Sequence, residues 1–172
     1  MAISLYDVSV ASFQQVVGAA SGFMDKAESH CQANNIDLEK LLETRLHPDM
    51  LPLRYQIASV AHHSMGAIDG AMAGRFSPLS GPERDYAGLR QMIADAGTGL
   101  DKVSRDEVEA LEGKDVVFEL GDFRLEFLAE DFLMTFTMPN LHFHATTAYD
   151  ILRMQGIPLG KRDYMGRMRT KA

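Results

Sequence analysis

The chain has 172 residues, with 17 basic and 24 acidic side chains, and its net charge is −7. This charge argues against a nucleic-acid partner, because nucleic-acid-binding proteins need a basic face. No uninterrupted apolar run approaches the roughly 18 residues of a membrane span, so no membrane association is expected. The N-terminus lacks a signal segment and Cys31 is the single cysteine, so we expect a cytoplasmic protein. The length suits a single domain over residues 1–172.

Apolar residues at spacings of three and four predict a long first helix from about residue 5 to residue 34. Asp37 is placed to cap a short helix that ends near Leu42. A second long helix is expected over about residues 52–73, where Gly74 ends it.

The stretch RFSPLSGPE is expected to be a loop before the third long helix. Ser80 and Glu83 have the spacing of a capping box, which predicts that this helix begins there and runs to about Val103. Ser104 and Glu107 repeat the spacing and predict a further short helix.

The stretch VVFELGDFRLEF, residues 116–127, alternates with a period of two, which is typical of strands. A hairpin that turns at Gly121 and Asp122 places all its apolar residues on one side and sets Glu119 opposite Arg124 on the other. Because an isolated hairpin is marginally stable, its apolar side is expected to cover part of the helical body.

The last long helix is expected over about residues 130–155, with Pro139 inside it. Proline removes one helical hydrogen bond and clashes with the carbonyl of Thr135, so we expect a kinked helix. Two helices that break at Met138 are the second choice. A basic, partly mobile tail follows from about residue 160. Four long helices with a hairpin before the last one predict an all-α four-helix bundle.

Three segments of the chain resemble one family: SLYDVSV, RLHPDMLPLRYQ and PNLHFHATTAYDILRMQGIPLGKRDY. They are similar to the DinB/YfiT-like helical bundles, and most of all to a branch catalogued as a domain of unknown function. The resemblance covers nearly the whole chain and implies a four-helix bundle. Many members bind a divalent metal through three histidines, one early in the second helix and two one turn apart in the fourth. Some of these members are thiol-dependent transferases or isomerases, and others have no known activity.

The resemblance carries over to only part of the metal site. The family pattern of LR followed by Gly matches residues 152–156, which places the second histidine of the fourth helix on His144 and the first on Asn140. The histidine of the second helix falls on Gln56. Two of the three implied ligands are therefore amides, and no cofactor is expected. Only an enzyme of the family's metal-dependent kind would use His144 as a metal ligand.

Helical spacing brings the same residues together. Asn140 and His144 lie four apart within an apolar stripe, and Gln56 and His63 lie seven apart on one face of the second helix. These four residues predict a polar pocket for a small polar ligand. The alternative is a hydrogen-bonded network that fixes the register of the helices. His142 lies about 200° around the helix from His144, so the two are not expected to bind one ion.

Three functional hypotheses follow from these observations. The first is a small-molecule binding or interaction module with a degenerate metal site, which is also expected to form a homodimer. The second, which the family resemblance implies, is a metal-dependent thiol transferase or isomerase. The third is a purely structural homodimer. The sequence shows no nucleophile motif, and Cys31, on the apolar stripe near a helix end, is expected to be a buried, inert thiol. It leaves open whether the protein is an enzyme.

Overall fold

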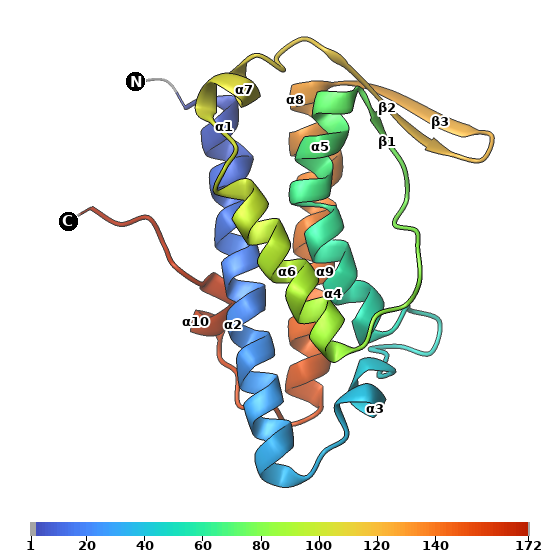
Figure 1. The fold of residues 1–172 in the computed structure, drawn as a ribbon, viewed down its shortest axis with the longest axis vertical. Coiled ribbons are helices and arrows are strands. Elements are labelled where there is room, and N and C mark those ends of the chain that lie inside the picture. Colours follow the sequence, from blue (N-terminus) through green and yellow to red (C-terminus); the bar gives the residue numbers. More distant parts are fainter. Residues whose placement is uncertain (1–2, 172) are drawn as a thin grey trace.

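The computed structural model describes residues 3–171 as an elongated helical bundle with a small sheet near one end (Figure 1). The helices are α1 (Leu5–Val8), α2 (Val10–Asn34), α3 (Leu38–Leu42), α4 (Leu53–His62), α5 (Met65–Ala73), α6 (Tyr86–Leu100), α7 (Arg105–Glu109), α8 (Ala129–Asp131), the π-helical segment η1 (Phe132–Thr137), α9 (Met138–Met154) and α10 (Lys161–Met165). The strands are β1 (Arg75–Phe76), β2 (Asp115–Leu120) and β3 (Phe123–Leu128).

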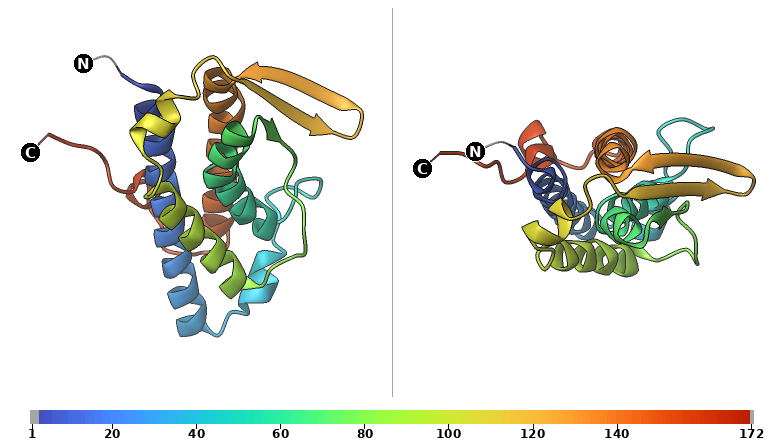
Figure 2. Two further views of the ribbon diagram at one scale, coloured as in Figure 1. Left: turned by 45° about the horizontal axis from the view of Figure 1, so that its top comes forward. Right: turned by 90° about the horizontal axis from the view of Figure 1, so that it is seen from above.

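The long helices pack around one apolar core. Helix α4 packs against α6 and α9, and α2 packs against the same two helices from the other side. The view along the bundle in Figure 2 shows this arrangement. Phe13, Phe23 and Phe132 are fully buried within it. The burial of apolar side chains is the main force that holds the helices together. The predicted helical bundle with a hairpin before its last long helix is confirmed.

Two of the predicted long helices are interrupted at a serine. The hydroxyl of Ser9 donates to the carbonyl of Leu5 at 2.6 Å, where α1 gives way to α2. The hydroxyl of Ser64 donates to the carbonyl of Val60 at 2.7 Å, where α4 gives way to α5. A serine that bonds to a preceding carbonyl competes with the helical pattern and bends the chain. The prediction of two continuous helices is therefore wrong at these serines, although the predicted stop at Gly74 is confirmed.

The start of the third long helix is not at Ser80. Helix α6 begins at Tyr86, and the carboxylate of Asp85 caps it by accepting a hydrogen bond from the amide of Gly88 at 2.8 Å. Asp85 therefore caps the third long helix in place of Ser80 and Glu83, and the helix begins later than predicted. Residues 77–85 remain a loop, which forms one wall of a cleft described below.

Two other predicted caps are confirmed. The carboxylate of Asp37 accepts a hydrogen bond from the amide of Glu39 at 2.9 Å at the start of α3. Ser104 and Glu107 form a reciprocal capping box at the start of α7. Both arrangements satisfy amide groups that the first turn of a helix leaves unpaired.

The predicted hairpin and its register are confirmed, since β2 and β3 pair antiparallel with Phe118 opposite Leu125. Strand β1 was not predicted, because it is only two residues long; it pairs parallel with β2. Gly70 allows β1 to lie close to α5, because a Cβ atom at Gly70 would stand 2.8 Å from the ring of Phe76.

Only the root of the hairpin covers the bundle. Val116 is fully buried, whereas Leu120 and Phe123 at the tip are 57% and 55% exposed. Figure 2 shows the two strands extending sideways beyond the helices. The expectation that the apolar side covers the helical body is right for the root and wrong for the tip.

The last long helix passes through Pro139 by way of a π-helical segment. Pro139 lies in the first turn of α9, directly after η1. In this segment an amide reaches back five residues, as Met138 does to the carbonyl of Leu133. The wider turn accommodates a residue that has no amide hydrogen. The predicted interruption at Pro139 is thus a π-helical segment, and the alternative of two separate helices is wrong.

Part of the segment after α9, which was predicted to be a basic tail, forms α10 and packs against the bundle. Helix α10 lies against α2, where Lys26 pairs with Asp163 at 2.6 Å and Gln15 donates to the carbonyl of Met165 at 2.7 Å.

Within residues 3–171, no helix is both long and apolar enough to cross a membrane.

Candidate functional site

Three of the four residues predicted to form a pocket lie together where α4 packs against α9. Nδ1 of His144 lies 2.7 Å from Oε1 of Gln56. The rings of His63 and His144 stack, with their centroids 5.6 Å apart and their planes at 15°. The fourth residue, Asn140, instead donates its amide hydrogen to the carbonyl of Phe136 at 2.7 Å, within its own helix. Asn140 is therefore not part of the hydrogen bond that joins Gln56 to His144.

The hydrogen bonds of Gln56 fix the tautomer of His144. The amide nitrogen of Gln56 donates to the carbonyl of Leu51 at 2.8 Å, so its oxygen is the atom that faces His144. Nδ1 of His144 therefore carries the hydrogen and donates it to Gln56. Its Nε2 atom holds the lone pair and is available as an acceptor.

His62 joins this group, although helical spacing did not select it. Its Nε2 atom donates to the carbonyl of Ser77 at 2.9 Å, and its ring stacks on Phe76 with centroids 4.4 Å apart. Its ring also meets the ring of His63 edge-on at 5.1 Å. Helical spacing did not predict that His62 and His63 share a site, because α4 ends at His62. The two side chains therefore do not point in the directions that a continuous helix would give them. Ser64, which follows His63, was the feature of the sequence that could have predicted this helix end, because a serine can interrupt a helix.

We call Gln56, His62, His63 and His144 the histidine site. Burial lowers the pKa of His63 to about 3 and the pKa of His144 to about 4, and the neighbouring imidazoles add to both shifts. Burial also lowers the pKa of His62. All three rings are therefore neutral at pH 7. The site offers hydrogen-bond donors and acceptors without a net charge.

One atom of the histidine site has no partner. Nδ1 of His63 is buried and makes no hydrogen bond to any of the described residues 3–171. The rings of Phe76 and Phe136 lie beside it, with centroids 5.6 Å and 6.2 Å from that of His63. Buried polar atoms are nearly always paired, so this nitrogen calls for an explanation.

The residues present do not fit the three-histidine metal centre that the family resemblance implies. Oxygen Oε1 of Gln56 is engaged with His144, and Asn140 is engaged with the carbonyl of Phe136. His142 faces α10, where its Nδ1 atom lies 3.1 Å from the hydroxyl of Tyr164, so the predicted divergence of His142 and His144 is confirmed. Across the part of the chain that the structure describes, no three His, Cys, Asp or Glu side chains are arranged to hold a metal.

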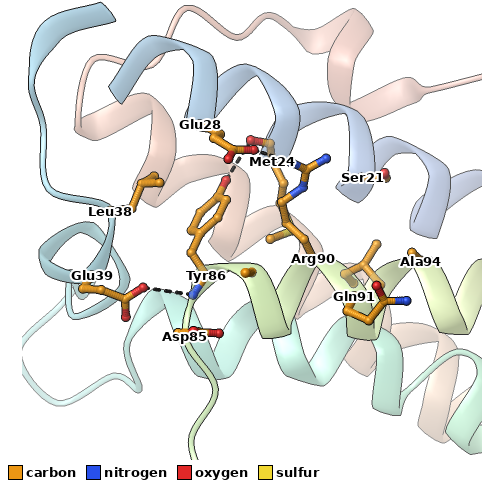
Figure 3. Close-up of a pocket in the computed structure, with 12 residues that line it drawn as sticks. Ser21, Met24, Glu28, Leu38, Glu39, Asp85, Tyr86, Arg90, Gln91 and Ala94 are labelled. Carbon is orange, nitrogen blue, oxygen red and sulfur yellow. Dashed lines mark hydrogen bonds and ion pairs between the residues drawn. The ribbon is translucent and has the colours of Figure 1, made fainter. Parts of the chain in front are cut away.

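A second polar site lies on another side of the bundle, between α2, α3 and α6 (Figure 3). This Tyr86 cleft has a volume of about 470 Å³. The hydroxyl of Tyr86 donates to the carbonyl of Met24 at 2.7 Å, and its amide donates to Glu39 at 3.0 Å. Arg90, which also lines the cleft, forms ion pairs with Asp25 and Glu28 of α2. These pairings tie α6 to α2 and α3, which is a structural role.

The helical bundle with a hairpin before its last long helix defines a DinB-like fold. The chain belongs to the family described as Domain of unknown function (DUF1993), whose pattern matches residues 5–165. It is similar to the crystal structure of a DinB family member protein from Shewanella denitrificans, with 30% sequence identity and a TM-score of 0.77. That match covers 98% of this chain and 95% of the other. No curated protein matches the chain. The predicted resemblance to DinB/YfiT-like bundles of unknown function is confirmed.

Proposed function

We propose that the chain is a small-molecule-binding module whose ligand is a small, neutral, polar molecule held at the histidine site. The observation that carries this proposal is the buried Nδ1 atom of His63, which has no partner among the described residues. An unpaired buried polar group costs about 1–3 kcal/mol. A ligand that hydrogen-bonds to this nitrogen would recover that free energy on binding.

The chemistry of the site defines the class of ligand. Nε2 of His144 is an acceptor, because Nδ1 donates to Gln56. Nδ1 of His63 is a donor or an acceptor, depending on its tautomer. A hydroxyl or a primary amide offers both kinds of partner. A charged ligand is disfavoured, since the site has no opposite charge to compensate for its burial.

The alternative of a metal-dependent thiol transferase or isomerase has weaker support. Two of the implied ligand positions are Gln56 and Asn140, and an amide oxygen binds transition metals less well than an imidazole nitrogen. Cys31 is buried, and burial raises the pKa of its thiol, which disfavours the reactive thiolate. Elemental analysis of tag-free protein purified without chelator tests this alternative. About one equivalent of zinc, nickel or iron that is lost in His144→Ala would favour the enzyme.

The binding proposal is tested with two neutral probes, acetamide and propane-1,2-diol. Long-range proton–nitrogen NMR reports the tautomer and hydrogen bonding of each histidine ring. We expect either probe to shift the Nδ1 resonance of His63 and to raise the melting temperature with concentration, because a ligand of the folded state stabilises it by mass action. His63→Phe should abolish both responses.

His142→Gln is the matched control, because His142 is an exposed histidine on α9, the helix that carries His144, and lies outside the histidine site. This variant should respond to the probes like the unaltered protein. Two outcomes would overturn the proposal. One is that neither probe perturbs His63 or His144, and the other is that His63→Phe responds as fully as the unaltered protein.

The homodimer expected from the sequence is also proposed here. Its support is the apolar surface of the hairpin tip and α9, where Leu120, Phe123 and Phe143 are each more than half exposed. Light scattering at tens of micromolar protein should give the mass of a dimer, in roughly the range expected for a specific interface. A monomeric mass at that concentration would contradict this proposal and leave the binding proposal unaffected.

A further inference from the structure

A cleft apart from the histidine site lies where the segment RLHPDMLPLRYQ meets the loop before α6. It has a volume of about 280 Å³. Its apolar lining includes Ala58 of α4 and Leu89 and Met92 of α6, with the ring of Tyr55 and the side chain of Leu79 beside them. We call it the arginine cleft, because three arginines also line it, Arg45, Arg54 and Arg84, and outnumber its two carboxylates, Glu43 and Glu83.

Hydrogen bonds hold the walls of the arginine cleft in place. Arg54 is only 14% exposed, and its Nε atom donates to Glu43 at 2.8 Å. Its Nη1 atom donates to the backbone carbonyl of Arg84 at 2.6 Å, so one side chain joins both walls. Arg45 donates to the carbonyl of Met50 and thereby braces the segment before α4. A site whose walls are fixed in advance loses little entropy when a ligand binds.

The charges around the cleft are unevenly paired. Arg54 forms ion pairs with Glu39 and Glu43. Neither Arg45 nor Arg84 has a carboxylate within ion-pair distance among residues 3–171, although both line the cleft. Both arginines line the same cleft as the apolar residues of its floor, in a protein whose net charge is −7. Guanidinium groups bind carboxylates through paired, charge-assisted hydrogen bonds.

We propose that the arginine cleft binds small monocarboxylates that carry an apolar tail. The tail lies on the floor formed by Ala58, Leu89 and Met92, and the carboxylate meets Arg84 and Arg45. This site differs from the histidine site in its ligand, which is an anion rather than a neutral molecule. The two sites are nevertheless neighbours. The ring of Tyr55 lines the cleft and meets the ring of His144 edge-on at 5.9 Å.

The test compares three probes with the same tail: hexanoate, hexanamide and hexylamine. Titration of ¹⁵N-labelled full-length protein, followed by NMR, gives the affinity of each probe and the residues that it perturbs. Hexanoate should perturb α4, α6 and residues 77–85, and it should bind about tenfold more tightly than either matched probe. Butanoate, octanoate and phenylacetate extend the test to other tails.

Arg84→Gln is the sharpest variant. It removes the guanidinium but keeps the backbone carbonyl that holds Arg54. It should weaken hexanoate binding by about tenfold. Arg153→Gln removes an exposed arginine of α9 that does not line the cleft, and it should leave the affinity unchanged. Ala58→Leu should block binding by filling the floor, provided that its circular dichroism shows an intact fold.

The proposal is overturned if none of the four carboxylates binds at about 10 mM. It is also overturned if hexanamide or hexylamine binds as tightly as hexanoate, or if Arg84→Gln leaves the affinity unchanged. His63→Phe separates the two proposed sites. It should abolish the response to acetamide and propane-1,2-diol while hexanoate binding persists, so the failure of one proposal is visible apart from the failure of the other.

Discussion

The Tyr86 cleft and the histidine site both place polar side chains between packed helices, yet their hydrogen bonds are completed to different degrees. Tyr86 is 4% exposed, and both its hydroxyl and its amide have partners. His63 is 9% exposed, and its Nδ1 atom has none within the described part of the chain. Burial is therefore similar at the two residues, and the pairing of polar atoms is what separates them.

The difference indicates which site exists for stability. At the Tyr86 cleft, the buried hydroxyl donates a hydrogen bond that joins α6 to α2, so a structural role explains its presence. At the histidine site, the unpaired nitrogen of His63 costs free energy in the ligand-free fold. Polar groups that destabilise the resting fold are a common feature of functional sites. Measurements of stability can therefore test whether the two sites differ in this way.

The largest expected effect is a loss of stability in mild acid. Burial holds the pKa of His63 at about 3 and that of His144 at about 4, whereas the ordinary pKa of a histidine is 6.5. Below pH 6.5 the unfolded chain therefore binds more protons than the folded one, and the free energy of unfolding falls as the pH falls. For the pair we expect a loss of about 3 kcal/mol between pH 7 and pH 5, measured by urea unfolding.

The double variant His63→Phe with His144→Gln should remove most of this pH dependence. His47→Gln serves as the control, because His47 is an exposed loop histidine outside the site, whereas burial also lowers the pKa of His142. The Tyr86 cleft should not contribute, since burial raises the pKa of Tyr86 further from this range. Equal urea midpoints at pH 7 and pH 5 in the unaltered protein would mean that the histidines are not held neutral by the fold.

Sequence periodicity predicted the long helices and the hairpin. It did not predict the places where two groups compete for the same hydrogen bond or where two residues could cap the same helix. The hairpin register followed from an alternation that only one pairing satisfies, as Phe118 opposite Leu125 illustrates. The breaks at Ser9 and Ser64 depend on whether a hydroxyl or an amide bonds to a given carbonyl. The start of α6 after Asp85 rather than after Ser80 depends in the same way on which of the two residues caps the helix. Periodicity carries no information about such choices.

The same limit explains the candidate site. Gln56 and His144 were found by helical spacing and a family resemblance, and the structure brings them within hydrogen-bond distance. Asn140 shares the face of His144 by spacing, yet its side chain bonds within its own helix, just after the π-helical segment. His62 was missed because α4 ends there. The unpaired state of His63 depends on contacts from several segments, which no spacing rule can supply.

A loss of stability of intermediate size is expected at the Tyr86 cleft, where the buried polar atoms have partners. Tyr86→Phe removes the hydroxyl that donates to the carbonyl of Met24 while keeping the ring in the core. The net contribution of such a hydrogen bond is about 1 kcal/mol, so urea unfolding at pH 7 should show a loss of that size. Gln91→Ala, an exposed position that also lines the cleft, is the control and should change little. An unchanged midpoint in Tyr86→Phe would remove the structural explanation of this cleft.

The smallest expected effect has the opposite sign. His63→Phe is the same kind of change as Tyr86→Phe, because in both an aromatic ring stays in place and a buried polar atom is lost. Here no bond is broken, since Nδ1 of His63 has no partner in the described residues. The rings of Phe76 and Phe136 already surround the position and favour an apolar neighbour. We expect a gain of up to about 1 kcal/mol at pH 7, limited by the slightly larger volume of phenylalanine.

The sign of this change is the decisive measurement, because both variants put phenylalanine at a buried position. If His63→Phe is stabilising and Tyr86→Phe is destabilising, a polar group is kept at His63 at the expense of stability, and function accounts for its presence. If His63→Phe costs as much as Tyr86→Phe, then Nδ1 of His63 is paired in solution, for instance by a water molecule. The histidine site would then be the network that fixes helix register, and the binding proposal would lose the observation that carries it.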